Sequence, residues 1–265
     1  MMTRAIFAIL ALFLCFQGSA GLTQSAMDGV DLTLPRMVEA ELTREEVADR
    51  LAKSTETNPA DFTRMRLNGL DLSGLDFSGA ILRAAAFNGT DFSGARFDDA
   101  VLDQAWALKS DFSGASLRGA SLFQTQFHNA DFTGADLENS RAAADFTRAD
   151  LTGANLRGAD FSADMRNQSM GLMRGVLRKA LLDGADLTGA LMSRADLEFA
   201  KLRDANLTDA DLSMATLGGA DLTGASVAGA VFDKADITST RLLALQGATD
   251  GQFTDARNFK RAIWK

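Results

Sequence analysis

The chain has 265 residues, of which 46% are hydrophobic and 23% are charged. This composition is typical of a folded globular protein, and it excludes a disordered chain and a bundle of membrane-spanning helices. The net charge of −8 disfavours nucleic acid and anionic lipid as partners, and a single His with no Tyr leaves few groups for acid–base chemistry.

Residues 1–20 have the pattern of a secretory signal peptide. Arg4 is the only charge before Asp28, residues 5–16 are all apolar, and small residues follow up to Ala20. A run of twelve apolar residues is short for a bilayer span. We therefore expect export to the periplasm or out of the cell, with no membrane contact after cleavage. The alternative is a buried N-terminal helix.

Cys15, the only cysteine, lies inside the apolar run. A lipid-anchored envelope protein would carry its lipid on this residue. Leu14 directly before it departs from the small residue that lipoprotein signals have at that place, so lipidation is the weaker alternative. Cleavage after Ala20 would leave a mature chain without cysteine, whose stability must come from its own core.

Residues 21–59 form an N-terminal segment with a predicted capping helix. Thr43 followed three residues later by Glu46 is a capping-box pattern, and the residues after it suit a helix from Arg44 to about Ser54. We expect Val47 and Leu51 to pack onto the structure that follows.

A period of five residues runs from 60 to 245. Most cells have Leu or Phe at the centre, usually Ala two residues before, Asp or Asn between them, and two small or polar residues after, with Ala107 as a weak cell. Residues two apart share one face of an extended segment, so Ala and Leu or Phe point inward together. A period of five fits neither a helix nor a flat sheet. The chain must therefore coil, with a short strand and a turn in each cell.

These cells resemble the A-(D/N)-L-x-x signature of the pentapeptide-repeat family, over about 35 cells. The resemblance implies an all-β fold, a right-handed quadrilateral parallel β-helix with four cells per coil. Residues twenty apart would then stack on one another. Phe92, Phe112 and Phe132 would form one column, while Phe77 and Phe97 would begin another.

The frame of five breaks once. Phe146 follows Leu137 by nine residues instead of ten, and the next candidate centre after Phe161 is Leu172, eleven residues on. The old frame would place Thr147 and similar polar residues in the core, which burial costs forbid. We predict a loop over residues 162–171. It is either a tolerated insertion or a partner-binding loop, whose candidate residues are Met165, Arg166, Asn167, Gln168 and Met170.

Residues 246–265 form a predicted C-terminal cap or tail. Phe253, Phe259, Ile263 and Trp264 offer apolar cover for the last coil, which a solenoid needs. The alternative is a tail that binds a partner or forms a homodimer through this end.

No catalytic or metal motif is present. The sequence lacks paired cysteines, a phosphate-binding loop and a nucleophile elbow. His128 is alone at an outward position, and the Asp rows are expected to bond to neighbouring backbone at the corners. We therefore predict no enzyme, no cofactor and no metal.

The favoured function is an exported scaffold or protein-interaction module whose partner is another protein. The alternative, implied by the resemblance, is a DNA-mimicking topoisomerase inhibitor. That function would require a cytoplasmic protein, against the predicted signal peptide.

Overall fold

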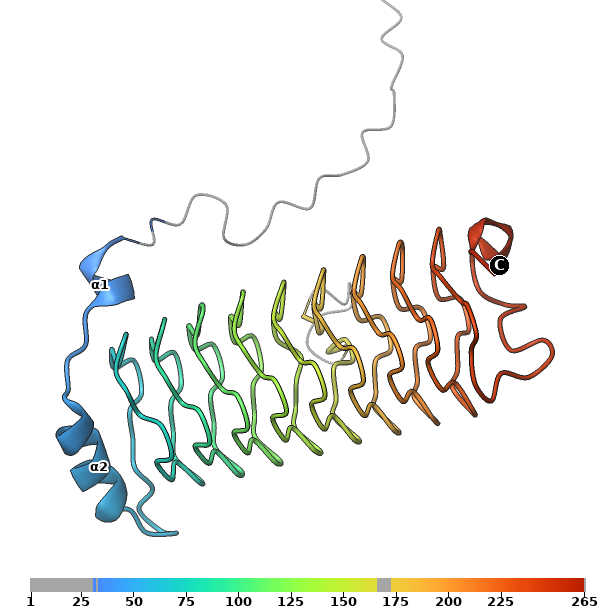
Figure 1. Ribbon diagram of the computed structural model, residues 1–265. Coiled ribbons are helices and arrows are strands. Elements are labelled where there is room, and N and C mark those ends of the chain that lie inside the picture. Colours follow the sequence, from blue (N-terminus) through green and yellow to red (C-terminus); the bar gives the residue numbers. More distant parts are fainter. Residues whose placement is uncertain (1–30, 32, 166–172, 265) are drawn as a thin grey trace, which may run out of the picture. The chain divides into compact units, whose positions relative to one another are not determined.

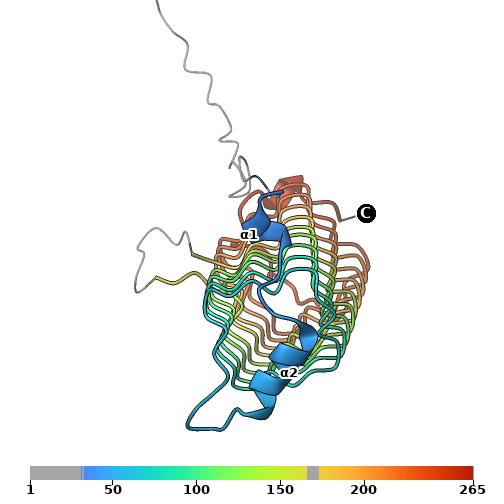
Figure 2. The same cartoon turned by 90° about the vertical axis from the view of Figure 1, so that its left-hand side faces the viewer.

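The computed structural model describes residues 31, 33–165 and 173–264, so the predicted signal peptide lies outside the described residues. Residues from Thr33 onward form one compact unit. Parallel bridges join residues twenty apart, from Asp61 with Ile81 to Ser226 with Gln246, so four cells complete each coil. Figure 1 shows these coils stacked side by side, and Figure 2 shows them end on.

The four sides of the coil are named here by their inward centres. The centres of the first coil are, in chain order, Phe62 on face 4, Leu67 on face 1, Leu72 on face 2 and Phe77 on face 3. Each face gains its next centre twenty residues later, up to the frame break. Corner 4/1 joins face 4 to face 1, and corner 1/2 joins face 1 to face 2.

The inward residues form one continuous core. The Leu and Phe centres and most of the Ala residues two before them are fully buried, and Ala107 is a core centre despite its small side chain. The predicted phenylalanine columns are confirmed. The ring centroids of Phe92 and Phe112 lie 5.1 Å apart, those of Phe112 and Phe132 4.9 Å, and those of Phe77 and Phe97 4.8 Å.

Each regular cell ends in a tight turn at a residue with positive φ, and the described exceptions are the cells centred on Ala142 and Phe161. Glycine takes this place in many cells, as at Gly114, where φ is 61°. Glycine adopts this conformation at low cost because it has no Cβ. Other residues occupy it elsewhere, among them Lys179 at 58°. The corners therefore carry exposed side chains of varied chemistry without changing the path of the chain.

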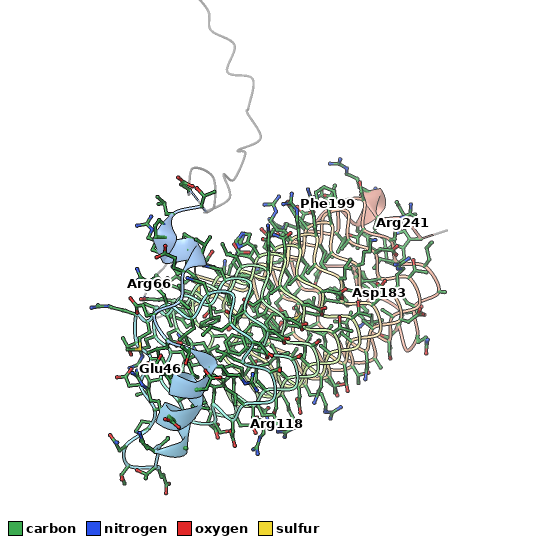
Figure 3. All side chains as sticks on the ribbon, turned by 60° about the vertical axis from the view of Figure 1, so that its left-hand side comes forward. Glu46, Arg66, Arg118, Asp183, Phe199 and Arg241 are labelled. Carbon is green, nitrogen blue, oxygen red and sulfur yellow. The ribbon has the colours of Figure 1, made fainter. Side chains whose placement is uncertain are left out.

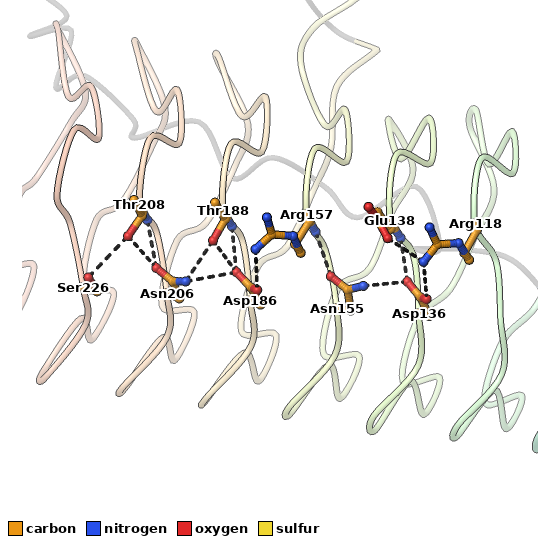
Figure 4. A network of polar contacts seen from close by, with 10 residues as sticks. All are labelled: Arg118, Asp136, Glu138, Asn155, Arg157, Asp186, Thr188, Asn206, Thr208 and Ser226. Atoms are coloured by element: carbon orange, nitrogen blue, oxygen red, sulfur yellow. Dashed lines mark hydrogen bonds and ion pairs between the residues drawn. The ribbon is translucent and has the colours of Figure 1, made fainter.

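Polar side chains form ladders along the outside. On face 3, Arg118 contacts Asp136 at 2.9 Å and Glu138 at 2.5 Å, and Arg157 contacts Asp186 at 3.1 Å. Figure 4 shows the network continuing toward Ser226. Burial opposes ionisation of Asp186, but hydrogen bonds from Thr188 and Arg157 outweigh it and lower the pKa of Asp186. The polar side chains outside this face are thus largely hydrogen-bonded to, or ion-paired with, one another.

Two short helices precede the first coil: α1 is Pro35–Val38 and α2 is Arg44–Ala52. The predicted capping helix is present, ending two residues before the predicted Ser54. Thr43 and Glu46 form the reciprocal capping box, and Val47 is fully buried against the core. The amide of Asn68 donates to the Glu39 carbonyl at 2.9 Å and so ties the segment after α1 to face 1.

The C-terminal end holds a short 3₁₀ helix, η1 (Phe259–Arg261). Phe253 is buried, with its ring centroid 4.5 Å from that of Phe232, as expected for a cap. Trp264 packs 5.3 Å from Phe253 yet remains exposed, as do Phe259 and Ile263. The apolar cover at this end is therefore partial.

Candidate functional site

The regular coil is interrupted at corner 4/1 in two consecutive coils. In the first, the bridges shorten to nineteen residues, as between Gln126 and Asp145, because one residue is missing between the centres Ala142 and Phe146. A tight turn closes the gap, with the Ala144 N–H donating to the Ala142 carbonyl at 2.7 Å. The predicted one-residue shift is confirmed.

In the next coil the same corner carries an insertion. The bridges lengthen to thirty-one residues, as between Asp145 and Val176, and the centre after Phe161 is Leu177. Five residues separate the centres of regular cells, while sixteen separate these two, so eleven residues are extra. Leu172, the centre expected after Phe161, lies outside the described residues. The described bridges place Phe161 on face 4 of its coil and Leu177 on face 1 of the next.

The neck of the insertion is built from main-chain hydrogen bonds. The Asp164 N–H donates to the Met173 carbonyl at 2.8 Å, and the Gly175 N–H donates to the Phe161 carbonyl at the same distance. A Cβ on Gly175 would lie 2.7 Å from the Phe161 Cβ, so only glycine allows this close return. The chain leaves and re-enters the stack at nearly one point.

Arg141 braces the neck from the preceding coil. Its guanidinium lies 4.0 Å from the centroid of the Phe123 ring, in a cation–π contact. It also lies 3.7 Å from the Asp164 carboxylate. The short corner and the neck above it are therefore linked by one side chain.

The predicted partner-binding residues fall mostly beyond this neck. Met165 is described and is 44% exposed. Arg166, Asn167, Gln168 and Met170 lie outside the described residues. Figure 2 shows the neck projecting from one corner of the stack.

Ion pairs cover face 1 beside the insertion. Asp196, which is buried, lies 3.3 Å from Arg174 and 3.6 Å from Arg178. Arg178 also pairs with Glu198. This cluster joins the end of the insertion to the next coil, so the neck has a rigid polar support on both sides.

His128 occupies an outward position, as predicted, but it is only 7% exposed. Its Nε2 lies 3.3 Å from Asp145 Oδ2 without the alignment of a hydrogen bond, and neither ring nitrogen is hydrogen-bonded. Burial lowers the pKa of His128, Asp145 opposes this shift, and Arg148 adds to it. The imidazole is therefore held neutral in a packed polar cluster.

The outward Asp residues cap the turns, as expected. On face 2, Asp91 and Asp111 each accept a hydrogen bond at 2.8 Å from the backbone N–H two residues later, and Asp150 does so at 2.9 Å. Over the described residues, no group of three or more His, Cys, Asp or Glu could hold a metal ion. Nor is any described helix long and apolar enough to cross a membrane.

Comparison with known proteins identifies the repeat. The model of the pentapeptide repeats, in eight copies, matches residues 60–83, 95–139, 142–163, 176–209 and 210–242. The gap between residues 163 and 176 coincides with the insertion. A search of curated proteins found no match.

Solved structures of such repeats are similar to the chain. HetL, a protein involved in heterocyst differentiation regulation in the cyanobacterium Nostoc sp. strain PCC 7120, is 29% identical, with 84% of this chain and 97% of that chain covered and a TM-score of 0.35. Full-length QnrB1, a plasmid-mediated fluoroquinolone resistance protein, is 19% identical over 76% of this chain and 91% of that chain, with a TM-score of 0.40.

The family model matches more than half of the chain. The chain belongs to the pentapeptide-repeat family and folds as a right-handed quadrilateral parallel β-helix.

Proposed function

We propose that the protein is an exported, non-enzymatic scaffold that binds another protein at the corner carrying the insertion. The observation that supports it is the placement of eleven extra residues at one corner of an otherwise regular stack, on a neck fixed by two hydrogen bonds. Binding residues are often placed on loops that a rigid scaffold positions.

The absence of catalytic motifs from the sequence supports a binding role. Many outward Asp and Arg side chains of the repeat are engaged in turns and ladders, which favours the insertion and the corners as places of contact. Export rests on the pattern of residues 1–20 alone. Homodimerisation through the C-terminal end is supported by exposed Phe259, Ile263 and Trp264.

The eleven extra residues can be deleted without changing the spacing of the core centres. Removing residues 164–174 leaves Phe161, Ser162, Ala163, Gly175, Val176 and Leu177 in direct succession, which restores the spacing of five. Since the neck residues 164 and 173 pair with each other, the stack above and below keeps its bridges. We expect the shortened protein to fold with a melting temperature within a few degrees of the parent.

The test is capture of partner proteins from the periplasmic fraction by the full and the shortened mature chains, compared side by side. Loss of a partner with the fold intact is the expected result. Equal capture by both chains would contradict the proposal and leave the insertion as a tolerated length change. A matched control replaces Met165 alone with Ser and tests whether the described exposed side chain contributes.

A further inference from the structure

Phe199 occupies a conformation that aromatic residues rarely adopt. It lies at corner 1/2 with φ at 59°, and it is the only aromatic side chain among the non-glycine residues of positive φ in the described ranges. Positive φ is an outlier for a bulky residue. Phe199, labelled in Figure 3, is nevertheless 55% exposed. Burial of the ring therefore does not compensate the free-energy cost of this backbone conformation.

The next coil accommodates this ring. Gly219 follows Phe199 in the same corner row, and a Cβ on Gly219 would lie 2.6 Å from the ring. The ring therefore lies over a glycine that has no side chain to displace it. An exposed aromatic side chain supported in this way has few orientations left to lose on binding.

Unpaired cations surround Phe199. Lys179 precedes it in the corner row, because the Lys179 N–H bonds to the Glu198 carbonyl next to Phe199. Arg148 comes before Lys179 in that row, and Lys201 bridges Leu181 on adjoining face 2. Within the part of the chain that the structure describes, Arg148, Lys179 and Lys201 have no ion-pair partner, whereas Arg178 and Arg203, in the coils of Lys179 and Lys201, do.

We propose that this cationic-aromatic edge, made of Arg148, Lys179, Phe199 and Lys201, binds an acidic polypeptide segment that presents an apolar side chain to Phe199. Positive charge without internal partners, in a chain of net charge −8, is complementary to carboxylates outside the molecule. Aromatic and cationic side chains placed together are typical of binding hot spots. Strain at an exposed residue is typical of functional sites.

The extent of the edge favours a short polypeptide over a membrane or a nucleic acid. Asp150 and Asp221 on face 2, and Asp183 and Asp204 at the corner after face 2, limit the positive region to a few residues. A long polyanion or an anionic bilayer would also meet the acidic remainder of the surface, which repels it. A short acidic segment can engage the cations without that penalty. The proposal rests on the scaffold function but not on the insertion.

The test uses the mature chain and a fluorescein-labelled peptide with a Leu-Phe pair between runs of glutamate, followed by fluorescence anisotropy. We expect binding that weakens as salt rises, and at least tenfold weaker binding by Phe199→Asn and by the double variant Lys179→Glu with Lys201→Glu. The counterpart peptide with lysines in place of glutamates should not bind. Absence of binding by the acidic peptide overturns the proposal.

Matched controls lie at corner 4/1. Met214→Asn and Lys234→Glu alter residues that also have positive φ, at 58° and 57°, and both variants should bind as the parent does. Asn tolerates positive φ, and Asn129 already occupies the row of Phe199. Phe199→Asn should therefore keep the parent melting temperature within a few degrees.

A large fall in the melting temperature of Phe199→Asn would make Phe199 a packing residue and overturn the proposal. Tighter binding to heparin or to phosphatidylglycerol vesicles than to the acidic peptide would overturn the choice of partner. Loss of peptide binding by Phe199→Asn together with full binding by the chain lacking residues 164–174 would separate this edge from the site proposed at the insertion.

Discussion

A substitution in this fold has an effect set by the side of the strand on which it lies. Ala205 is fully buried two residues before the centre Leu207, while Arg203 is exposed on the outside, paired with Asp183. Ala205→Leu forces extra atoms into a close-packed coil and should destabilise by about 1–3 kcal/mol or more. Arg203→Leu loses an exposed ion pair, which contributes at most about 1 kcal/mol. Thermal unfolding of the two variants checks this, and equal melting temperatures would contradict the inward assignment.

His128 should make stability depend on pH near neutrality. Its pKa is lowered in the folded protein, chiefly by burial, so the folded state binds fewer protons than the unfolded state. The contribution is present above about pH 6.5, the ordinary pKa of His, and is lost as the pH falls below it, with a slope of at most about 1.4 kcal/mol per pH unit.

Denaturant unfolding at pH 7.5 and pH 5.5 measures this effect, since the chain has no other His. The carboxylates of Asp186 and Asp236, whose pKa values are lowered, stay ionised over this range. We expect the parent to lose stability on acidification and His128→Gln to lose less. An equal loss in both proteins would mean that the ring nitrogens find partners when protonated.

At the scale of the elements, the strands and corners could be predicted because the same pattern of small, polar and large apolar residues recurs in most cells. Ala and Leu or Phe two apart define an inner side, and a residue of positive φ defines a corner. The shift at Phe146 was also predictable, because the alternative frame would bury Thr147. The number of sides came from the family resemblance, since a period of five does not determine how many strands close a coil.

The length of the insertion could not be predicted from the spacing alone. Leu172 lies five residues before Leu177 and therefore fits the period of five in the sequence. The bridge between Asp160 and Leu191 shows that Phe161 already occupies the fourth face of its coil. The burial of His128 and the strain at Phe199 were missed for a related reason. Both residues occupy positions that the repeat treats as outward, and their surroundings depend on residues twenty apart in the stack.

The whole stack behaves as a one-dimensional array in which each coil contacts only its neighbours, so its ends determine how far it frays. Val47 is fully buried where α2 covers the first coil, whereas Ala52 of the same helix is exposed. Val47→Asp places an unpaired charge in that contact, which costs several kcal/mol unless the helix detaches. Ala52→Asp introduces the same side chain into water and serves as the control.

We expect Val47→Asp to lose amide hydrogen-exchange protection in the first coils, over about residues 60–100, with a decreasing effect further along the stack. The coils beyond Leu177 should keep the parent level of protection, because neither their neighbours nor their bridges change. Ala52→Asp should match the parent throughout. Uniform loss of protection along the whole stack would show instead that the coils unfold as one unit, so that the cap stabilises the last coil as much as the first.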